Sequence, residues 1–279
     1  MEEKMIFFSS VIVFIALVVS FQGHAEAVRV DNPLAESDPD IYQGDMILDE
    51  EQKNYFRQLT KFEAFPERKW PEVLLRGGIR TGRYRVRYII DESYSGEDRS
   101  IIRNAINDWN NRVGKCVEWQ NIPGKISNKT TYVEIKSVKG CSLRIGKMEG
   151  SGAQVLSLVT NCLSRASILH EMMHAVGFIH EQNRYDRNDS IRVLWDNIPS
   201  GFKGEFEVPP NGQYDDYGPF DFYSVMMYAI YAFGKDKPAY EVLVPGIDLE
   251  QTGEGRLSDH SLTDLDVAGI IHLYGCTNV

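Results

Sequence analysis

The 279-residue sequence contains no block of lysine and arginine, no internal repeat and no low-complexity tract. Its formal net charge is −10, and an acidic surface repels a phosphate backbone. We therefore predict that nucleic acid is not a partner, whereas neutral or basic polypeptides could still bind. Hydrophobic residues make up 43% of the chain and charged residues 25%, which is the composition of a globular protein of one or two domains.

Long apolar stretches are also scarce, and the one that exists lies near the N-terminus, over residues 6–21. It is short for a membrane span, and Ala25-Glu26-Ala27 after it resembles a signal-peptide cleavage site. We interpret residues 1–27 as the signal peptide of a secreted, extracellular protein without stable membrane association. An uncleaved anchor is the alternative, because Glu2-Glu3-Lys4 is not the usual basic start.

Cysteine is rare, with only four residues in the chain. An even number in an exported protein predicts two disulfides, and four cysteines allow three pairings between which the sequence does not choose. Glycosylation sequons begin at Asn128 and Asn188. The cysteines are Cys116, Cys141, Cys162 and Cys276.

Residues 28–69 differ from the rest of the chain, because they are rich in Asp and Glu early on and hold no cysteine. Such a segment has little apolar surface and would not fold alone. We interpret it as a pro-segment or linker that ends between Leu59 and Pro71, with a short polar helix over residues 49–62. Residues 70–279 then form the folded domain.

The spacing of apolar residues predicts the main elements of that domain. Because strands mostly precede helices, the expected class is α+β. Ser258 or Ser261 suits the N-cap of the last helix, and residues 201–220, rich in Gly and Pro, are expected to form a loop. The predicted strands are 84–90, 132–135 and 155–159, and the predicted helices are 98–113, 168–176 and 262–274.

The most informative stretch is His170-Glu-Met-Met-His174, followed by Gly177 and His180. Residues at i and i+4 share one face of a helix, so both imidazoles can reach one cation. A continuous helix would carry His180 about 15 Å further along its axis, so the chain must turn back, and Gly177 permits that turn. Three neutral nitrogens leave one coordination position open, as in catalytic zinc sites. We therefore predict one Zn²⁺ per chain, with Glu171 as the general base toward its water.

Histidines on an ordinary helix are the alternative to a metal site. The five-residue pattern alone should arise by chance in on the order of one chain in a hundred of this length. Gly177 and His180 at their offsets lower that frequency by roughly a thousandfold. Chance is therefore a poor explanation here, whereas His260 and His272 are expected to be ordinary surface or core residues.

The stretch from His170 to His180 resembles the zinc motif of the metzincins, and Glu181 with Arg184 resembles the astacin family within them. Residues 224–228 (Ser-Val-Met-Met-Tyr) resemble the Met-turn of that family. The resemblance covers roughly residues 70–276 and implies a zinc endopeptidase of two lobes. The N-terminal lobe would hold a mixed sheet and the zinc-binding helix, and the cleft would hold protein or peptide substrates.

The resemblance also implies roles for individual residues. Met226 would form the apolar floor beneath the metal, and Tyr228 would be a further ligand that swings away and donates a hydrogen bond to the oxyanion. The stretch 152–158 would be the edge strand above the cleft, to which an extended peptide could add, with a plain structural strand as the alternative. The implied disulfides are Cys141–Cys162 and Cys116–Cys276.

Tyr42-Gln43-Gly44-Asp45 resembles the pro-segment motif of the same family. Asp45 would then bind the zinc in place of the catalytic water and silence the enzyme, since a carboxylate is a good zinc ligand. The alternative is a plain turn built on Gly44-Asp45. After cleavage the new N-terminus would pair with Glu181, and Arg68-Lys69 is a candidate processing site.

The sequence departs from the family at two places. About ten extra residues, from Glu72 to Gly82, follow Trp70-Pro71, and the sequence continues for only three residues after Cys276. We therefore expect a minimal, single-domain and monomeric member. A catalytically silent binding or adhesive protein of the same fold is the alternative function, but the three histidines, Glu171 and Tyr228 favour catalysis.

Overall fold

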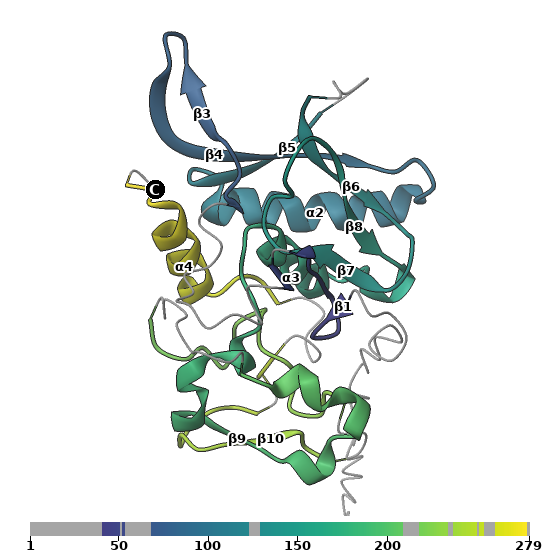
Figure 1. The fold of residues 1–279 in the computed structure, drawn as a ribbon, viewed down its shortest axis with the longest axis vertical. Coiled ribbons are helices and arrows are strands. Elements are labelled where there is room, and N and C mark those ends of the chain that lie inside the picture. The colour runs from purple at the N-terminus through teal and green to yellow at the C-terminus, as the bar shows by residue number, and fades with distance from the viewer. Residues whose placement is uncertain are drawn as a thin grey trace, which may run out of the picture.

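The structure is a computed structural model in which a mixed sheet and its helices lie above a second, smaller lobe (Figure 1). No helix of the described residues is long and apolar enough to cross a membrane. The predicted signal peptide lies outside these residues, as does most of the predicted helix over 49–62. The described residues are 41–50, 52–53, 68–122, 129–208, 218–233, 237–249, 251–253 and 260–277.

The upper lobe is built on an eight-stranded sheet with the order β1-β2-β7-β8-β6-β4-β3, and β5 also pairs with β4. β4 runs parallel to β5 and β6, and β6 runs parallel to β8, whereas β7 is antiparallel to β8. The sheet is therefore mixed, as predicted. Its strands are β1 (Ile41–Tyr42), β2 (Met46–Ile47), β3 (Glu72–Leu75), β4 (Ile79–Ile90), β5 (Val117–Asn121), β6 (Thr131–Lys136), β7 (Cys141–Arg144) and β8 (Gly152–Leu158).

The edge-strand prediction for residues 152–158 is wrong. β8 lies inside the sheet, because it pairs with β6 along its length and with β7 over Leu156–Leu158. Its inward side chains, such as Leu156, are fully buried, which fits a central strand. β7 is the next strand outward, and its other side carries β2 in parallel, with Met46 opposite Leu143.

The long helix α2 (Gly96–Val113) and the helix α3 (Arg165–Ala175) pack together against the sheet. α2 begins at Ser95, which forms a capping box with Asp98, and it buries an apolar stripe that includes Trp109. α3 is buried along its whole length except at its first residue, so its sequence shows little amphipathic contrast. The predicted helices 98–113 and 168–176 are confirmed within a few residues.

The last helix, α4 (Asp264–Tyr274), returns to the upper lobe beside α2. Its N-cap is Thr263, which forms a capping box with Asp266, so the prediction of Ser258 or Ser261 was wrong. The reason is that Thr263 has a carboxylate three residues later, whereas the Ser261 hydroxyl donates to Asp108.

The lower lobe has its own apolar core and little regular structure. It contains short 3₁₀ helices and a two-stranded ribbon, β9 (Ile191–Val193) with β10 (Tyr240–Val242). Residues 201–206 of the predicted loop instead belong to a 3₁₀ helix, η6 (Ser200–Phe206). Met227 and Tyr228 belong to this lower core, whereas the neighbouring Met226 belongs to the upper one. The Met-turn therefore joins the two lobes and does not belong to the lower lobe alone.

Two disulfides close the fold with the implied pairing. Cys116 bonds to Cys276, which ties the end of the described chain to the start of β5. Cys141 bonds to Cys162, which ties β7 to the turn before α3. The α+β class and the two-lobed architecture are thus confirmed.

Candidate metal centre

The centre is assembled by α3 and the loop that follows it. His170 and His174 stand one turn apart on α3, and their ring centroids are 4.6 Å apart. The helix ends after Ala175, and Gly177 adopts a φ of +110°, which residues with a Cβ rarely adopt. The reversed chain brings His180 to 3.3 Å from His170, measured between their Nε2 atoms. The turn predicted from Gly177 is confirmed.

Main-chain carbonyls orient two of these imidazoles. The Nδ1 atom of His170 lies 2.7 Å from the Val225 oxygen, and Nδ1 of His174 lies 2.7 Å from the Phe178 oxygen. A carbonyl can only accept, so each Nδ1 carries the proton and each Nε2 presents a lone pair. Both lone pairs face the centre of the cluster, as metal ligation requires.

Asp45 of the predicted pro-segment lies among the three histidines. Its Oδ2 is 3.1 Å from Nε2 of His170 and 3.2 Å from Nε2 of His180. Its Oδ1 is 3.4 Å from Nε2 of His174 and 3.2 Å from Nε2 of His180. One donor atom from each of the four residues lies within 4.8 Å of the others. Three imidazole nitrogens and one carboxylate oxygen fit a tetrahedral zinc ion.

The protonation of the cluster suits cation binding. Burial lowers the pKa of His180 to about 4, even though Asp45 opposes that shift. Burial would raise the pKa of Asp45, but the charges and hydrogen bonds of the histidines outweigh it and hold that pKa well below its usual value. An anionic carboxylate and a neutral His180 imidazole therefore prevail at neutral pH.

Glu171, Met226 and Tyr228 surround the cluster. Glu171 follows the first ligand on α3 and is 1% exposed. Met226 is buried beside α3 in the upper core. The ring of Tyr228 lies 4.5 Å from that of His180, and its hydroxyl donates to the main-chain oxygen of Gln43 at 2.9 Å. Tyr228 therefore lies against the histidine cluster, and Glu171 is buried next to His170 in the chain.

Glu181, the proposed partner of a new N-terminus, is buried and already has partners here. Its Oε1 accepts from the Asp221 amide at 2.8 Å and lies 3.4 Å from the Arg184 guanidinium. Burial raises the pKa of Glu181 to about 8, although Arg184 acts in the opposite direction. The Glu181 amide donates to the Met226 oxygen at 2.9 Å, which links the third ligand to the Met-turn.

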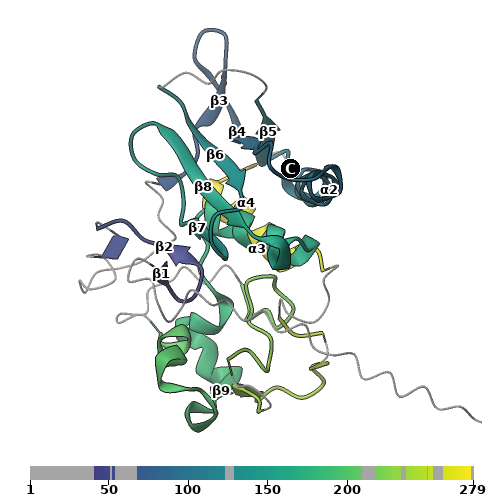
Figure 2. The same ribbon diagram turned by 90° about the vertical axis from the view of Figure 1, so that its right-hand side faces the viewer.

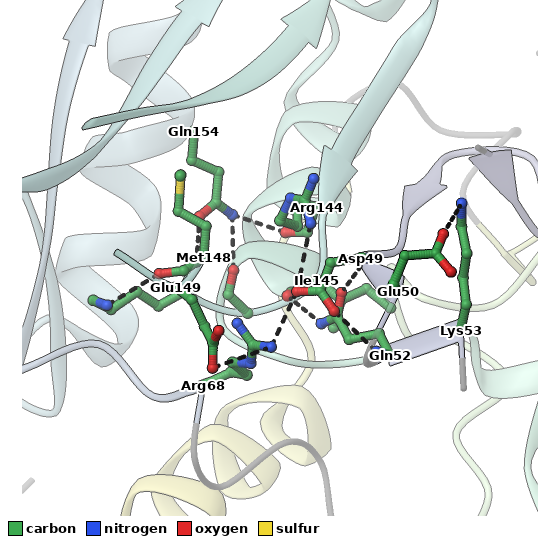
Figure 3. A network of polar contacts seen from close by, with 12 residues as sticks. Asp49, Glu50, Gln52, Lys53, Arg68, Arg144, Ile145, Met148, Glu149 and Gln154 are labelled. Carbon is green, nitrogen blue, oxygen red and sulfur yellow. Dashed lines mark hydrogen bonds and ion pairs between the residues drawn. The ribbon is translucent and has the colours of Figure 1, made fainter. Parts of the chain in front are cut away.

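A polar network fixes the segment that carries Asp45 (Figure 3). Asp49 forms ion pairs with Arg68 at 3.0 Å and with Arg144 of β7 at 3.5 Å. The Gln52 side chain donates to the Ile145 oxygen at 2.9 Å. Met46 packs against Ile145 in a small apolar cluster. Figure 2 shows β1 and β2 at the junction between the two lobes.

The candidate processing site at Arg68-Lys69 is protected in this form. The Arg68 side chain is 7% exposed, and its carbonyl accepts from the Lys147 amide at 2.7 Å. Trp70 behind it is buried and donates to the Ala175 oxygen at 2.8 Å. A protease could reach this bond only after local opening of the chain.

The sequence analysis did not identify Glu205 or Asn183 as site residues. The Asn183 amide donates to the main-chain oxygen of Glu205 at 3.0 Å, and the Glu205 side chain reaches the turn at Gly44. No local pattern marks either residue, because their contacts join distant segments. Of the two sequons, Asn188 is exposed on the 3₁₀ helix η4 (Tyr185–Asp189), and Asn128 lies outside the described residues.

A mixed sheet covered by helices, with three convergent histidines and a neighbouring glutamate, defines a zinc-dependent metallopeptidase centre. The family model described as Astacin, a peptidase family, matches residues 79–274. The chain belongs to the astacin family of zinc metalloproteinases. The family prediction and its metal are therefore confirmed.

Individual relatives agree with this assignment. Zinc metalloproteinase nas-15 of Caenorhabditis elegans is 34% identical over 193 residues, which cover 69% of this chain but 32% of that relative. Zinc metalloproteinase nas-4 of the same species is 32% identical over 246 residues, covering 85% of this chain and 70% of that relative. The chain thus spans about a third of the first relative and about two thirds of the second.

A solved structure shares the fold. It is that of high choriolytic enzyme 1, a hatching enzyme zinc-protease from Oryzias latipes, with a TM-score of 0.63 and 24% identity. The match covers 79% of this chain and 100% of that chain.

Proposed function

We propose that this protein is a secreted zinc endopeptidase that is made as a latent precursor, in which Asp45 blocks the metal. The observation that carries the proposal is the convergence of Asp45 with His170, His174 and His180, within 4.8 Å of one another. Three of these ligands come from the folded domain and one from the segment before it. Removal of that segment would leave three ligands and one open position, as catalysis requires.

Hydrolysis would divide its tasks between the metal and two side chains. Zinc, when bound, supplies Lewis acidity toward the substrate carbonyl and lowers the pKa of a coordinated water. The Glu171 carboxylate takes the proton of the attacking water and passes it to the amine of the leaving peptide. The Tyr228 hydroxyl, which now donates to the Gln43 oxygen, becomes available to donate to the developing oxyanion.

The pro-segment supports latency through its main chain as well as through Asp45. The Leu143 amide of β7 donates to the Asp45 oxygen at 3.1 Å, and β2 continues along the same strand. The segment therefore occupies the strand edge to which an extended peptide could add. A substrate would have to displace it before reaching the metal.

Processing would also give Glu181 a new partner. The acid is buried and now relies on Arg184 for its opposite charge. An inserted N-terminal amine would add a second cation beside it, which would lower its raised pKa. Secretion fits the apolar segment over residues 6–21 and the two disulfides.

The Glu171→Gln variant tests catalysis. It keeps the shape of the side chain and removes the base, so we expect kcat for casein peptides to fall by about a thousandfold with zinc content unchanged. Chelation should abolish the activity of the wild type, and added zinc should restore it. A processed wild type that binds zinc and cleaves no peptide at any pH would instead support the silent binding protein.

A further inference from the structure

The lower lobe presents an acidic wall, made of Glu205 and Glu207, to the pro-segment beside the metal centre. Glu205, near the end of η6, is 6% exposed, and Glu207 follows it on the surface. A Cβ placed on Gly44 would lie 3.1 Å from Oε2 of Glu205 and 3.2 Å from the Tyr228 hydroxyl. The pro-segment therefore passes close to Glu205 with its main chain at Gly44, where a side chain would require Glu205 or Tyr228 to shift.

The acidic wall is held at a fixed place relative to the metal ligands. Asn183, three residues after His180, is fully buried. Its side-chain amide donates to the main-chain oxygens of Glu205 and Glu207, at 3.0 and 2.9 Å. The Gln43 side-chain amide donates to the same Glu207 oxygen at 3.1 Å. Any residue that replaces Gln43 and Gly44 in the cleft would therefore meet the same wall.

Within the described part of the chain, no cation balances the buried Glu205 carboxyl. Of the residues that face it, Tyr42, Gln43 and Gly44 carry no positive charge, and Asp45 is itself acidic. The Oε2 atom accepts no hydrogen bond from the described residues. The polar neighbour of the carboxyl is the uncharged Tyr228 hydroxyl, which makes a hydrogen bond with it. The acid is therefore costly to ionise while the pro-segment covers it.

We propose that Glu205, with Glu207 beside it, is a specificity-determining residue that selects peptides with a lysine or arginine next to the scissile bond. The inference rests on the proposed endopeptidase function. Once the pro-segment leaves, the space over Glu205 opens toward the cleft, and a cationic side chain can enter. A charge-assisted hydrogen bond from an ammonium or guanidinium group then supplies the positive charge that the Glu205 carboxyl lacks.

Matched peptides test the proposal on the processed protein. One series of quenched fluorescent peptides carries Lys, Gln or Glu at each position flanking the cleaved bond and is otherwise identical. We expect kcat/KM to favour Lys over Gln at one such position by about tenfold, and Gln over Glu. Glu205→Gln should abolish the advantage of the Lys peptide over the Gln peptide. Glu205→Lys should reverse the order, so that the Glu peptide becomes the better substrate.

Glu241→Gln is the matched control, because it removes an acid from the same lobe at the exposed ion pair with Arg192. It should leave the order of the three peptides unchanged. A wild type without a preference for Lys at any flanking position would overturn the proposal. So would a Glu205→Gln variant that slows all three peptides equally, because that result would assign Glu205 to structure or to the positioning of Tyr228.

A binding measurement separates this proposal from the proposed function. Fluorescence anisotropy with the same peptides on processed Glu171→Gln protein needs no turnover. Tighter binding of the Lys peptide, lost when Glu205→Gln is added, would support the acidic wall even if the wild type were silent. Equal binding of the Lys and Glu peptides would reject it, whether or not the wild type cleaves them. Melting temperatures of each variant identify any protein that does not fold.

Discussion

Two hairpins lie at opposite ends of the strand order of the sheet. They differ in their burial and in the residues that hold them. The turn of the β1–β2 hairpin is buried at the metal centre, where Asp45 is 8% exposed. The β3–β4 hairpin projects from the top of the upper lobe in Figure 1, and its Leu74 and Leu75 are more than half exposed. It contains the extra residues from Glu72 to Gly82.

The difference lies in the range of their contacts. The first hairpin is held by residues far away in sequence, through the histidines and the pairing of Asp49 with Arg144. The second hairpin is held by local polar contacts, such as the ion pair of Arg80 with Glu72 at 2.6 Å. A hairpin can therefore form from nearby residues alone, but only distant partners give it a fixed place at a site.

The largest effect on either hairpin is expected from the removal of Asp45. Asp45→Ala deletes the charged contact of the first hairpin with three histidines, which we expect to weaken its docking by about 3 kcal/mol, or roughly a hundredfold. The unprocessed variant should then cleave casein, whereas the unprocessed wild type should not. A variant that folds, binds zinc and stays as silent as the wild type would show that Asp45 does not enforce latency.

The two turns offer a matched pair of glycines. Gly44 has a φ of +80°, and a Cβ there would lie 3.1 Å from Glu205 and 3.2 Å from Tyr228, whereas Gly77 has a φ of +89° and nothing within 4 Å of a Cβ. Gly44→Ala should cost about 2 kcal/mol, from backbone strain and contact, and should raise the activity of the unprocessed chain. Gly77→Ala should cost about 1 kcal/mol through strain alone and leave latency unchanged.

Thermal unfolding and casein cleavage by the unprocessed chains measure both effects. Equal activity of the two alanine variants would show that the contacts of Gly44 with Glu205 and Tyr228 do not matter for docking.

The smallest effect is expected from the ion pairs. Asp49→Asn removes one of the two acidic partners of the nearly buried Arg68, the other being Glu149 at 3.6 Å, so the chain near Arg68 should open more often. We expect trypsin to cleave after Arg68 about fivefold faster, which corresponds to about 1 kcal/mol. Glu72→Gln removes the exposed pair with Arg80 and should not alter the rate. N-terminal sequencing of the digest identifies the cleaved bond. Equal rates of cleavage after Arg68 in both variants would show that Asp49 does not anchor this segment.

The sequence predicted best what depends on neighbouring residues. The spacing of His170, His174 and Gly177 predicts a helix with two histidines on one face and the turn that ends it, and the structure has both. The stripe on α2 predicts a helix for the same reason. Asp45 was placed at the metal only through the family resemblance, because nothing in its own surroundings points to a residue 125 positions later.

The errors concern contacts between distant segments. The order of β7 and β8 follows from pairing between strands, and residues 152–158 alone do not reveal whether a neighbour covers them. Glu205 looks like an ordinary acid in a polar stretch, and its contacts with Asn183, Tyr228 and the turn at Gly44 join it to segments far away in sequence. The N-cap of α4 was misplaced because the Ser261 hydroxyl donates to Asp108. Asp108 lies far away in sequence, so the residues around Ser261 do not predict this contact.

The hydrogen bond between the Glu181 amide and the Met226 oxygen has a mechanical consequence. Glu181 follows His180, where the chain leaves the upper lobe, and Met226 is part of the upper core again. The bond therefore holds these two points of the chain together. A displacement of the Met-turn is therefore passed on to the residue that follows His180, and Tyr228 lies only two residues beyond this bond. Substitutions in the lower lobe that shift the Met-turn could then alter metal affinity without contacting the metal.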